Sequence, residues 1–193
     1  MLEAAIDIIE TDGEAGVRVD LVAEAAGVAK PTLYHFYKNR DGLIIAAQAE
    51  RYRRSLLYGF PTISEMVQAC RSREEFSSVL RNLIRSFALD EGKRRRRVRV
   101  QVLGSAASRP LLRAEIEAVE TAVASEFQRV FGIAQQRGWI GAQVDLDIVA
   151  RWWFGVMLGR HLVDSVFNEE QSDKWTDVTL RALEAVIFDV PAS

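Results

Sequence analysis

Apolar residues recur at steps of three and four along nearly the whole chain, which is the period of a helix buried on one face. Leu2, Ile6 and Ile9 begin this pattern, and no segment shows the two-residue period of a strand. We therefore predict an all-α fold. Expected helices are a first one that stops at residues 11–13, a second over 21–26, a third from residue 30, and further ones near 43–58, 63–70, 74–89, 93–107, 111–137, 145–168 and 173–188.

The length and the cysteine content favour a protein that folds in a reducing compartment. The 193 residues can bury one good core, and the single cysteine, Cys70, cannot form an intrachain disulfide. The sequence opens MLEAAIDIIE, which lacks the pattern of a secretory leader. The apolar stretch around Trp152 ends at Arg160, short of the ~20 residues that a bilayer requires. We expect a cytoplasmic protein.

The net charge of -2 hides a strong asymmetry along the chain. Residues 61–113 carry 12 Lys and Arg against 5 Asp and Glu, a net +7, whereas residues 114–193 carry 6 against 13, a net -7. Residues 28–54 hold six cations against two anions, a local +4. Such asymmetry often accompanies a polyanionic partner.

The segment from Leu21 to Phe36 has the spacing of a helix-turn-helix. Gly27 is suited to close the first helix, because glycine adopts a left-handed conformation at low cost. Lys30 and Pro31 then open the second helix, since proline fits the first helical turn. In this motif the second helix lies in the major groove of DNA and the first crosses the phosphate backbone.

The polar and apolar positions of this second helix predict which side faces DNA. Lys30, Thr32 and His35 are expected to project outward. Leu33 and Phe36 are expected to face inward, toward Ile6, Leu21 and Ala25.

The two tyrosines of this helix have apolar rings and polar tips that suit packing beside a sugar-phosphate strand. Tyr34 is interpreted as a contact, whereas Tyr37 remains open between contact and core. Lys38 and Arg40 follow within reach of phosphate, where each neutralised phosphate adds salt-sensitive affinity.

Taken together, about the first fifty residues resemble the DNA-binding signature of the tetracycline-repressor (TetR) family. The matching residues are Ile6, Gly13, Val22, Ala23, Ala26, Gly27, Val28, Pro31, Thr32, Leu33, Tyr34, Lys38, Asn39, Arg40 and Leu43. The resemblance implies an all-helical homodimer, with an N-terminal three-helix DNA-binding domain at residues 1–44. It also implies a C-terminal ligand-binding and dimerisation domain at residues 45–193, connected by the helix at 43–58.

The resemblance also implies which residues meet DNA. Family contact positions fall on Lys30, Pro31, Thr32, Tyr34, His35 and Arg40, and Lys38 is a plausible addition. The chain departs from the family at Arg18 and Asp20, where Ser or Thr is common, so Arg18 is expected to take the phosphate and Asp20 the helix cap. Ala29 replaces a frequent Ser, and the basic arm before the first helix is missing.

The run from Lys93 to Arg99 is the strongest charge cluster of the chain. It could form a second phosphate-binding patch, or it could be a solvated helix start with acidic neighbours from the C-terminal block. Four consecutive arginines point around a whole helical turn and cannot all meet one surface. The second interpretation is therefore favoured.

The helix expected at residues 145–168 is apolar on more than one face, as a helix between its own domain and a second subunit would be. Together with the helix at 173–188 it could form a four-helix dimer interface. The predicted interface residues are Trp152, Gly155, Val156, Gly159, Val163, Leu183, Val186 and Ile187.

A ligand pocket is expected among the helices of residues 63–137, with a contribution from the helix that carries the tryptophans. The candidates, for each of which core packing is the alternative, are Met66, Cys70, Phe76, Leu83, Phe87, Leu103, Phe127, Trp153 and His161. They suggest a small ligand that is partly apolar.

Catalysis is not predicted. Cys70 and the two histidines, His35 and His161, are far apart in sequence, and no metal-ligand spacing, phosphate loop or nucleophile elbow occurs. No cofactor and no metal are expected. Together with the family resemblance, the sequence predicts a dimeric regulator, a repressor, that binds a palindromic operator; its release by a small-molecule inducer is implied by the resemblance alone. The alternative is a helical dimer that acts through protein contacts, with weak or no specific DNA binding.

Overall fold

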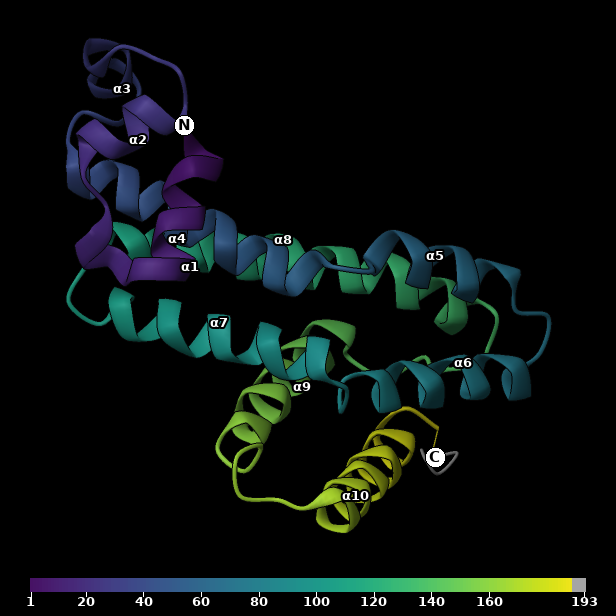
Figure 1. Cartoon of the computed structure of the whole chain (residues 1–193). Helices are drawn as coiled ribbons and strands as arrows, with labels where there is room; N and C mark the ends of the chain where they lie inside the picture. Colours follow the sequence, from purple (N-terminus) through teal and green to yellow (C-terminus); the bar gives the residue numbers. More distant parts are fainter. Residues whose placement is uncertain (189–193) are drawn as a thin grey trace. The chain divides into compact units, whose positions relative to one another are not determined.

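The computed structural model describes residues 1–188, and these residues form helices and the turns between them (Figure 1). The predicted all-α class is confirmed, and most helices agree with the apolar periodicity to within about four residues at their ends, but the helix expected at 145–168 ends at His161. They are α1 (Leu2–Gly16), α2 (Val19–Ala25), α3 (Lys30–Tyr37), α4 (Arg40–Leu57), α5 (Phe60–Ala69), α6 (Arg73–Ser86), α7 (Asp90–Ala106), α8 (Pro110–Gln136), α9 (Leu146–His161) and α10 (Glu169–Phe188).

The chain divides into two compact units. Unit 1 comprises Met1–Leu56 and Val98–Val119, and unit 2 comprises Leu57–Arg97 and Glu120–Ser193. Unit 1 therefore extends past the expected boundary at residue 44 and takes in parts of α7 and α8. The difference arises because residues 98–119, at the end of α7 and the start of α8, contact the first four helices, from which they are distant in sequence. The remaining residues of α7 and α8 belong to unit 2.

Unit 1 has its own apolar core, built mainly from the first four helices. Ile6 and Ile9 of α1 are buried there with Leu33 of α3 and Leu43 of α4. The first helix was expected to stop at Gly13, and its backbone is indeed non-helical there, with φ 71° and ψ -179°. The chain then resumes helical geometry as far as Gly16, so Gly13 produces a kink inside α1.

Unit 2 has a larger core, rich in aromatic side chains. Phe76 of α6 is fully buried at its centre, with its ring 6.2 Å from that of Phe131 and 6.0 Å from that of Trp139. Leu146 and Met157 of α9 and Leu183 of α10 complete the same cluster. None of the described helices combines the length and the apolar character that a membrane-spanning helix needs.

The burial pattern of unit 1 predicts how two leucine truncations will differ. Leu33→Ala is expected to lower the free energy of unfolding by about 2 to 5 kcal/mol, because Leu33 is fully buried and its removal leaves a cavity. Urea unfolding followed by far-ultraviolet circular dichroism measures this loss. Leu21→Ala is the control: Leu21 is 42% exposed, and its truncation should cost less than about 1 kcal/mol. Equal losses would contradict this description of the core.

Candidate functional site

The helices α2 and α3 form a helix-turn-helix within unit 1. Gly27 in the turn has φ 64°, the left-handed conformation expected where the first helix closes. The turn is fastened by a hydrogen bond from Val28 N to Ala23 O, at 3.0 Å. The helix α3 begins at Lys30, with Pro31 in its first turn. These elements define a protein with a DNA-reading motif.

The residues predicted to meet DNA are exposed in unit 1. Lys30, Thr32 and His35 lie on the surface of α3, as expected, and Tyr34 is 48% exposed beside them. The remaining predicted contacts, which are also exposed, are Arg18, Pro31, Lys38 and Arg40. Exposed polar side chains on and beside a short helix can contact both base edges and phosphates.

The inward face of α3 differs from the sequence prediction in one respect. Leu33 is buried as expected, but Phe36 is 63% exposed, and Tyr37 packs against the core of unit 1 instead. A helix turns 100° per residue, so the third residue after Leu33 points about 60° to one side of the direction of Leu33. The fourth residue points about 40° to the other side. The core of unit 1 lies on the side of Tyr37. Only the packing of the other helices decides which of the two sides faces the core. Phe36 thus joins the outward face, where its ring meets that of His35 edge to face at 5.4 Å.

The residues of α2 that face the core also differ from the prediction. Leu21 is 42% exposed and Ala25 is exposed, whereas Val22 and Ala23 are buried in their place. Ile6 is buried as predicted.

Lys30 is held by an ion pair within the motif. Its Nζ lies 2.7 Å from Oδ1 of Asp20, and the bond from Lys30 holds the pKa of the Asp20 carboxyl below its ordinary value. Asp20 was expected to cap α2, but that helix has no side-chain cap, and Asp20 pairs with Lys30 across the motif. Both side chains are more than half exposed, so Lys30 can exchange Asp20 for a phosphate oxygen at little cost.

Arg40 has a role inside unit 1 besides the predicted phosphate contact. Its Nε donates to the backbone oxygen of Val17 at 2.6 Å, and Nη2 donates to that of Glu14 at 2.5 Å. These carbonyls lie at the C-terminal end of α1, where a cation is favourable. Arg40 therefore joins the start of α4 to the end of α1.

The carboxylate of Glu14 is the centre of a polar cluster that the sequence analysis missed. It accepts hydrogen bonds from Gln48 Nε2 at 2.5 Å, from Ser105 Oγ at 2.5 Å and from Arg109 Nη1 at 2.6 Å. Arg109 Nε also lies 3.3 Å from Oδ1 of Asp41. The partners of Glu14 are 34 to 95 residues away in sequence, so no local pattern could have revealed the cluster.

These bonds determine the ionisation of Glu14. Burial by itself would raise the pKa of its carboxyl, but the hydrogen bonds from Ser105, Gln48 and Arg109 outweigh this, and the pKa lies below the ordinary value of 4.5. Glu14 is therefore charged at neutral pH, and its charge ties α1 to α4, to α7 and to the start of α8 within unit 1.

The basic run has acidic partners, as the favoured interpretation required. Lys93 and Arg94 pair with Asp90 and Glu91 one turn earlier in α7. Arg95 stacks over the ring of Tyr58 at 4.0 Å. Arg96 is fully buried, and it pairs with Asp164 of the acidic C-terminal block.

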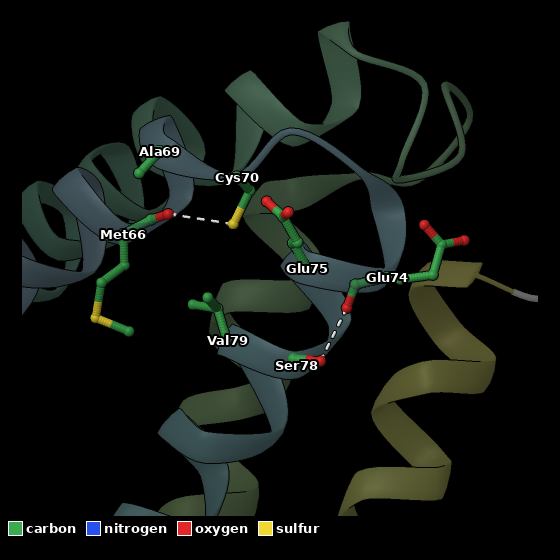
Figure 2. A pocket seen from close by; sticks show the side chains of 7 residues that line it. All are labelled: Met66, Ala69, Cys70, Glu74, Glu75, Ser78 and Val79. Carbon is green, nitrogen blue, oxygen red and sulfur yellow. Dashed lines mark hydrogen bonds between the residues drawn. The ribbon is translucent and has the colours of Figure 1, made fainter.

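A groove lies between α5 and α6 in unit 2 (Figure 2). It is an open surface groove of about 520 Å³, and two of the predicted pocket residues, Met66 and Cys70, line it. The Cys70 thiol donates to the backbone oxygen of Met66 at 3.2 Å, and burial raises the pKa of this thiol, which favours its neutral form. The other lining residues are Ala69, Glu74, Glu75, Ser78 and Val79.

The other predicted pocket residues lie elsewhere. Phe76 and Trp153 are buried in the core of unit 2, and three more are partly buried against that core: Leu83, Phe87 and Phe127. Leu103 belongs to unit 1, so it lies outside this core. His161 is half-buried at the end of α9, and its Nδ1 has no hydrogen-bond partner among the described residues.

The predicted dimer residues separate into inner and outer groups. Leu183 and Ile187 are buried in the core of their own chain, so they present almost no surface to a partner. Trp152 and Val156 are partly buried against the same core, and Val163 is half-buried. Val186 is exposed, and the space beside Gly155 and Gly159 is open among the described atoms.

Comparison with known proteins agrees with this geometry. Residues 1–47 match the model of the tetR family of bacterial regulatory proteins. A protein from Rhodococcus sp. assigned to the TetR family is 25% identical and has a TM-score of 0.67, over 96% of this chain and 95% of its own. A similarly assigned protein from Mesorhizobium loti MAFF303099 is 18% identical, with a TM-score of 0.69 over 96% and 93%.

A third similar structure is the transcriptional regulator FadR from Bacillus subtilis in complex with stearoyl-CoA. It is 17% identical to this chain and has a TM-score of 0.56, over 98% of this chain and 97% of its own. The comparison with curated proteins finds no match.

The fold and the exposed reading helix define a helix-turn-helix regulator, and the family match extends over that same motif. The chain matches the TetR family of bacterial regulatory proteins in its DNA-binding residues 1–47, and it has the fold of solved structures assigned to that family. It is therefore a DNA-binding transcription regulator and not an enzyme. Among residues 1–188, no group of three or more His, Cys, Asp and Glu side chains is arranged to hold a metal ion.

The Glu14 cluster predicts a pH-dependent contribution to stability. The pKa of Glu14 is lower in the folded state than in the unfolded state. The stability that its charge contributes is therefore complete at pH values above the unfolded-state pKa, and it is lost as the pH falls through the folded-state pKa. Glu14→Gln should therefore lower the free energy of unfolding by about 1 to 3 kcal/mol at pH 7. The deficit should shrink below about pH 4.5, where the parent protein also begins to lose the charge.

Urea unfolding at a series of pH values measures this difference. Glu24→Gln, on the exposed surface of α2, is the control and should leave the stability nearly unchanged. A deficit of Glu14→Gln that stays constant into the acid range would contradict the assignment.

Proposed function

We propose that the protein binds a palindromic operator as a homodimer, represses transcription there, and is released when a small, partly apolar molecule binds unit 2. The proposal that the protein binds an operator rests on the exposed face of α3. Thr32, Tyr34 and His35 stand free on that helix, and Lys30 and Lys38 flank it. Base contacts by the reading helix would select the sequence, and the flanking cations would supply salt-sensitive affinity.

Phe36 is added to the proposed DNA contacts. Its ring is mostly exposed on the face that carries His35, although an aromatic ring of this size is usually buried. In the major groove such a ring can make apolar contact with the methyl group of thymine. We therefore assign Phe36 to base recognition beside Tyr34.

The dimer half of the proposal rests on exposed apolar side chains of α9, α10 and the segment between them. Ile148, Leu162, Val166, Val178 and Val186 are all exposed in the single chain. Apolar surface of this extent commonly marks an association site. Dimerisation would bring two α3 helices to successive major grooves, which a palindromic operator requires.

The proposal that a small molecule binds unit 2 rests on the groove between α5 and α6. Its lining from Met66, Ala69 and Val79 is apolar, and Ser78 and two carboxylates add polar groups. A neighbour in fold, FadR of Bacillus subtilis, is in complex with stearoyl-CoA, which is an amphipathic ligand. Release would require that the ligand bind the released conformation more tightly than the operator-bound one. The proposed location is the cytoplasm, where operator DNA lies.

Operator selection tests the DNA half. The purified protein is incubated with a randomised duplex library, and the retained duplexes are sequenced. We expect an enriched inverted repeat. On that repeat, Tyr34→Ala and Phe36→Ala should each weaken binding about 10-fold or more, in keeping with the ~1 to 3 kcal/mol of a good base contact. Fluorescence anisotropy measures the affinities.

Leu111→Ala is the matched control, because Leu111 is an exposed apolar side chain of unit 1 outside the motif. It should bind the repeat as tightly as the parent. If no repeat is enriched, or if the α3 variants bind like the parent, the function would lie in protein contacts instead.

The dimer half predicts the effect of a charge placed on α10. Val178→Asp should shift the protein from dimer to monomer, because an aspartate in an apolar interface is costly to desolvate. Sedimentation equilibrium measures the mass. Leu89→Asp, at an exposed apolar position of unit 2 outside these helices, should leave the dimer intact. An unchanged mass for Val178→Asp would place the interface elsewhere.

A further inference from the structure

The helix-turn-helix carries an anion beside the residues proposed to meet DNA. Asp20 lies in the first turn of α2, and its Oδ1 is 2.7 Å from Nζ of Lys30, the first residue of α3. Both side chains are more than half exposed. The ion pair therefore lies at the surface, and it engages a cation at the start of the reading helix.

Asp20 also acts on a second cation of the proposed DNA surface. The pKa of its carboxyl is held below the ordinary value by the hydrogen bond from Lys30 first, and also by the positive charge of Arg18. Arg18 is exposed just before α2, and it is one of the residues proposed to contact phosphate. One carboxylate thus interacts with two of the cations on which sequence-independent affinity for DNA would depend.

The other two cations proposed to meet DNA have no such partner. Arg40 donates to two backbone oxygens at the end of α1, which carry partial charges only. Within residues 1–188, neither Lys38 nor Arg40 forms an ion pair with a carboxylate, whereas Lys30 does. Asp20 therefore opposes one particular cation of the motif and not the motif as a whole.

A phosphate that bonds to Lys30 would meet the charge of Asp20. The ion pair itself is weak, because both side chains are exposed, but after it breaks the freed carboxylate remains beside the phosphate. If Nζ instead holds both groups at once, Asp20 Oδ1 and the phosphate oxygen lie at most about 5.5 Å apart, and like charges repel at this distance. In either arrangement Asp20 opposes the contact between Lys30 and DNA.

This opposition predicts a particular salt dependence. Each phosphate that a cation neutralises releases counterions, and it steepens the fall of the logarithm of the binding constant with the logarithm of the salt concentration by about 0.9. A lysine that leaves a carboxylate behind has a smaller net release, because the freed carboxylate attracts a cation from solution. Lys30 therefore contributes less to this slope than a lysine without an acidic partner.

We propose that Asp20 competes with DNA phosphate for Lys30 and so restrains the sequence-independent affinity of the helix-turn-helix. This inference rests on the proposed DNA-binding face of α3. When the electrostatic contribution is restrained, the contacts that read bases supply a larger share of the binding free energy. Asp20 thus limits how strongly the protein is held on DNA of arbitrary sequence.

Binding of the full-length protein to a fluorescent duplex of random sequence tests the proposal. Asp20→Asn keeps the size of the side chain and removes its charge. Compared with the parent, this variant should bind about 5-fold more tightly in about 50 mM sodium chloride but less than about 2-fold more tightly in about 200 mM, because its slope is steeper by about 0.9. Fluorescence anisotropy measures the affinities, and far-ultraviolet circular dichroism checks that the variant remains helical.

Glu24→Gln is the matched control, because Glu24 is an exposed carboxylate of the same helix and forms no ion pair within the described part of the chain. It removes the same charge and should change the affinity less than about 2-fold at either salt concentration, since charges at a distance are screened. Lys30→Met removes the contested cation. In its presence, Asp20→Asn should strengthen binding no more than Glu24→Gln does.

The sign of the effect separates competition from its opposite. Weaker binding by Asp20→Asn would show that Asp20 presents Lys30 to DNA, and it would overturn the proposal. An unchanged affinity, a gain equal to that of Glu24→Gln, or a full gain that persists with Lys30→Met would overturn it as well. These outcomes leave the proposed DNA binding intact, whereas a parent protein that binds no duplex would overturn both proposals.

Discussion

The position of the reading helix depends on the burial of one side chain, Leu33. The helix α3 has eight residues, and an isolated helix of that length is not stable in water. Its stability and its orientation must come from packing against the rest of unit 1, where Leu33 is fully buried. Because Leu33 holds one side of the helix in the core, Thr32, Tyr34 and His35 face outward, and the packing of Tyr37 against the same core leaves Phe36 exposed as well. The face proposed to meet DNA is thus determined by apolar contacts on the opposite side of the helix.

Both units also bury charge, and in each the charge joins helices that are distant in sequence. In unit 1 the carboxylate of Glu14 gathers donors from α4, α7 and the residue before α8. In unit 2 Asp164 gathers Arg96 and Arg160. A buried charge costs free energy unless its partners are in place, so these clusters penalise arrangements in which the helices pack differently.

Much of the fold could be predicted from the sequence, because helices depend on local signals. The apolar period located all ten helices of residues 1–188, and Gly27 and Pro31 marked the turn of the DNA-reading motif. The DNA-reading face was predicted less completely. Leu33 was placed correctly, but Phe36 and Tyr37 flank it on either side, and the helical period alone could not decide which of them turns inward.

The sequence by itself determined the all-α class, the helix-turn-helix and its exposed cations, because each depends on residues within a few turns of one another. Only the tertiary structure decided that Phe36 faces outward, that Lys30 pairs with Asp20, and that Arg96 of the basic run is buried. It also decided that Leu183 and Ile187 belong to the chain's own core. The physical reason is the same in each case: a side chain's environment is set by the helices that pack around it, and these come from distant parts of the chain.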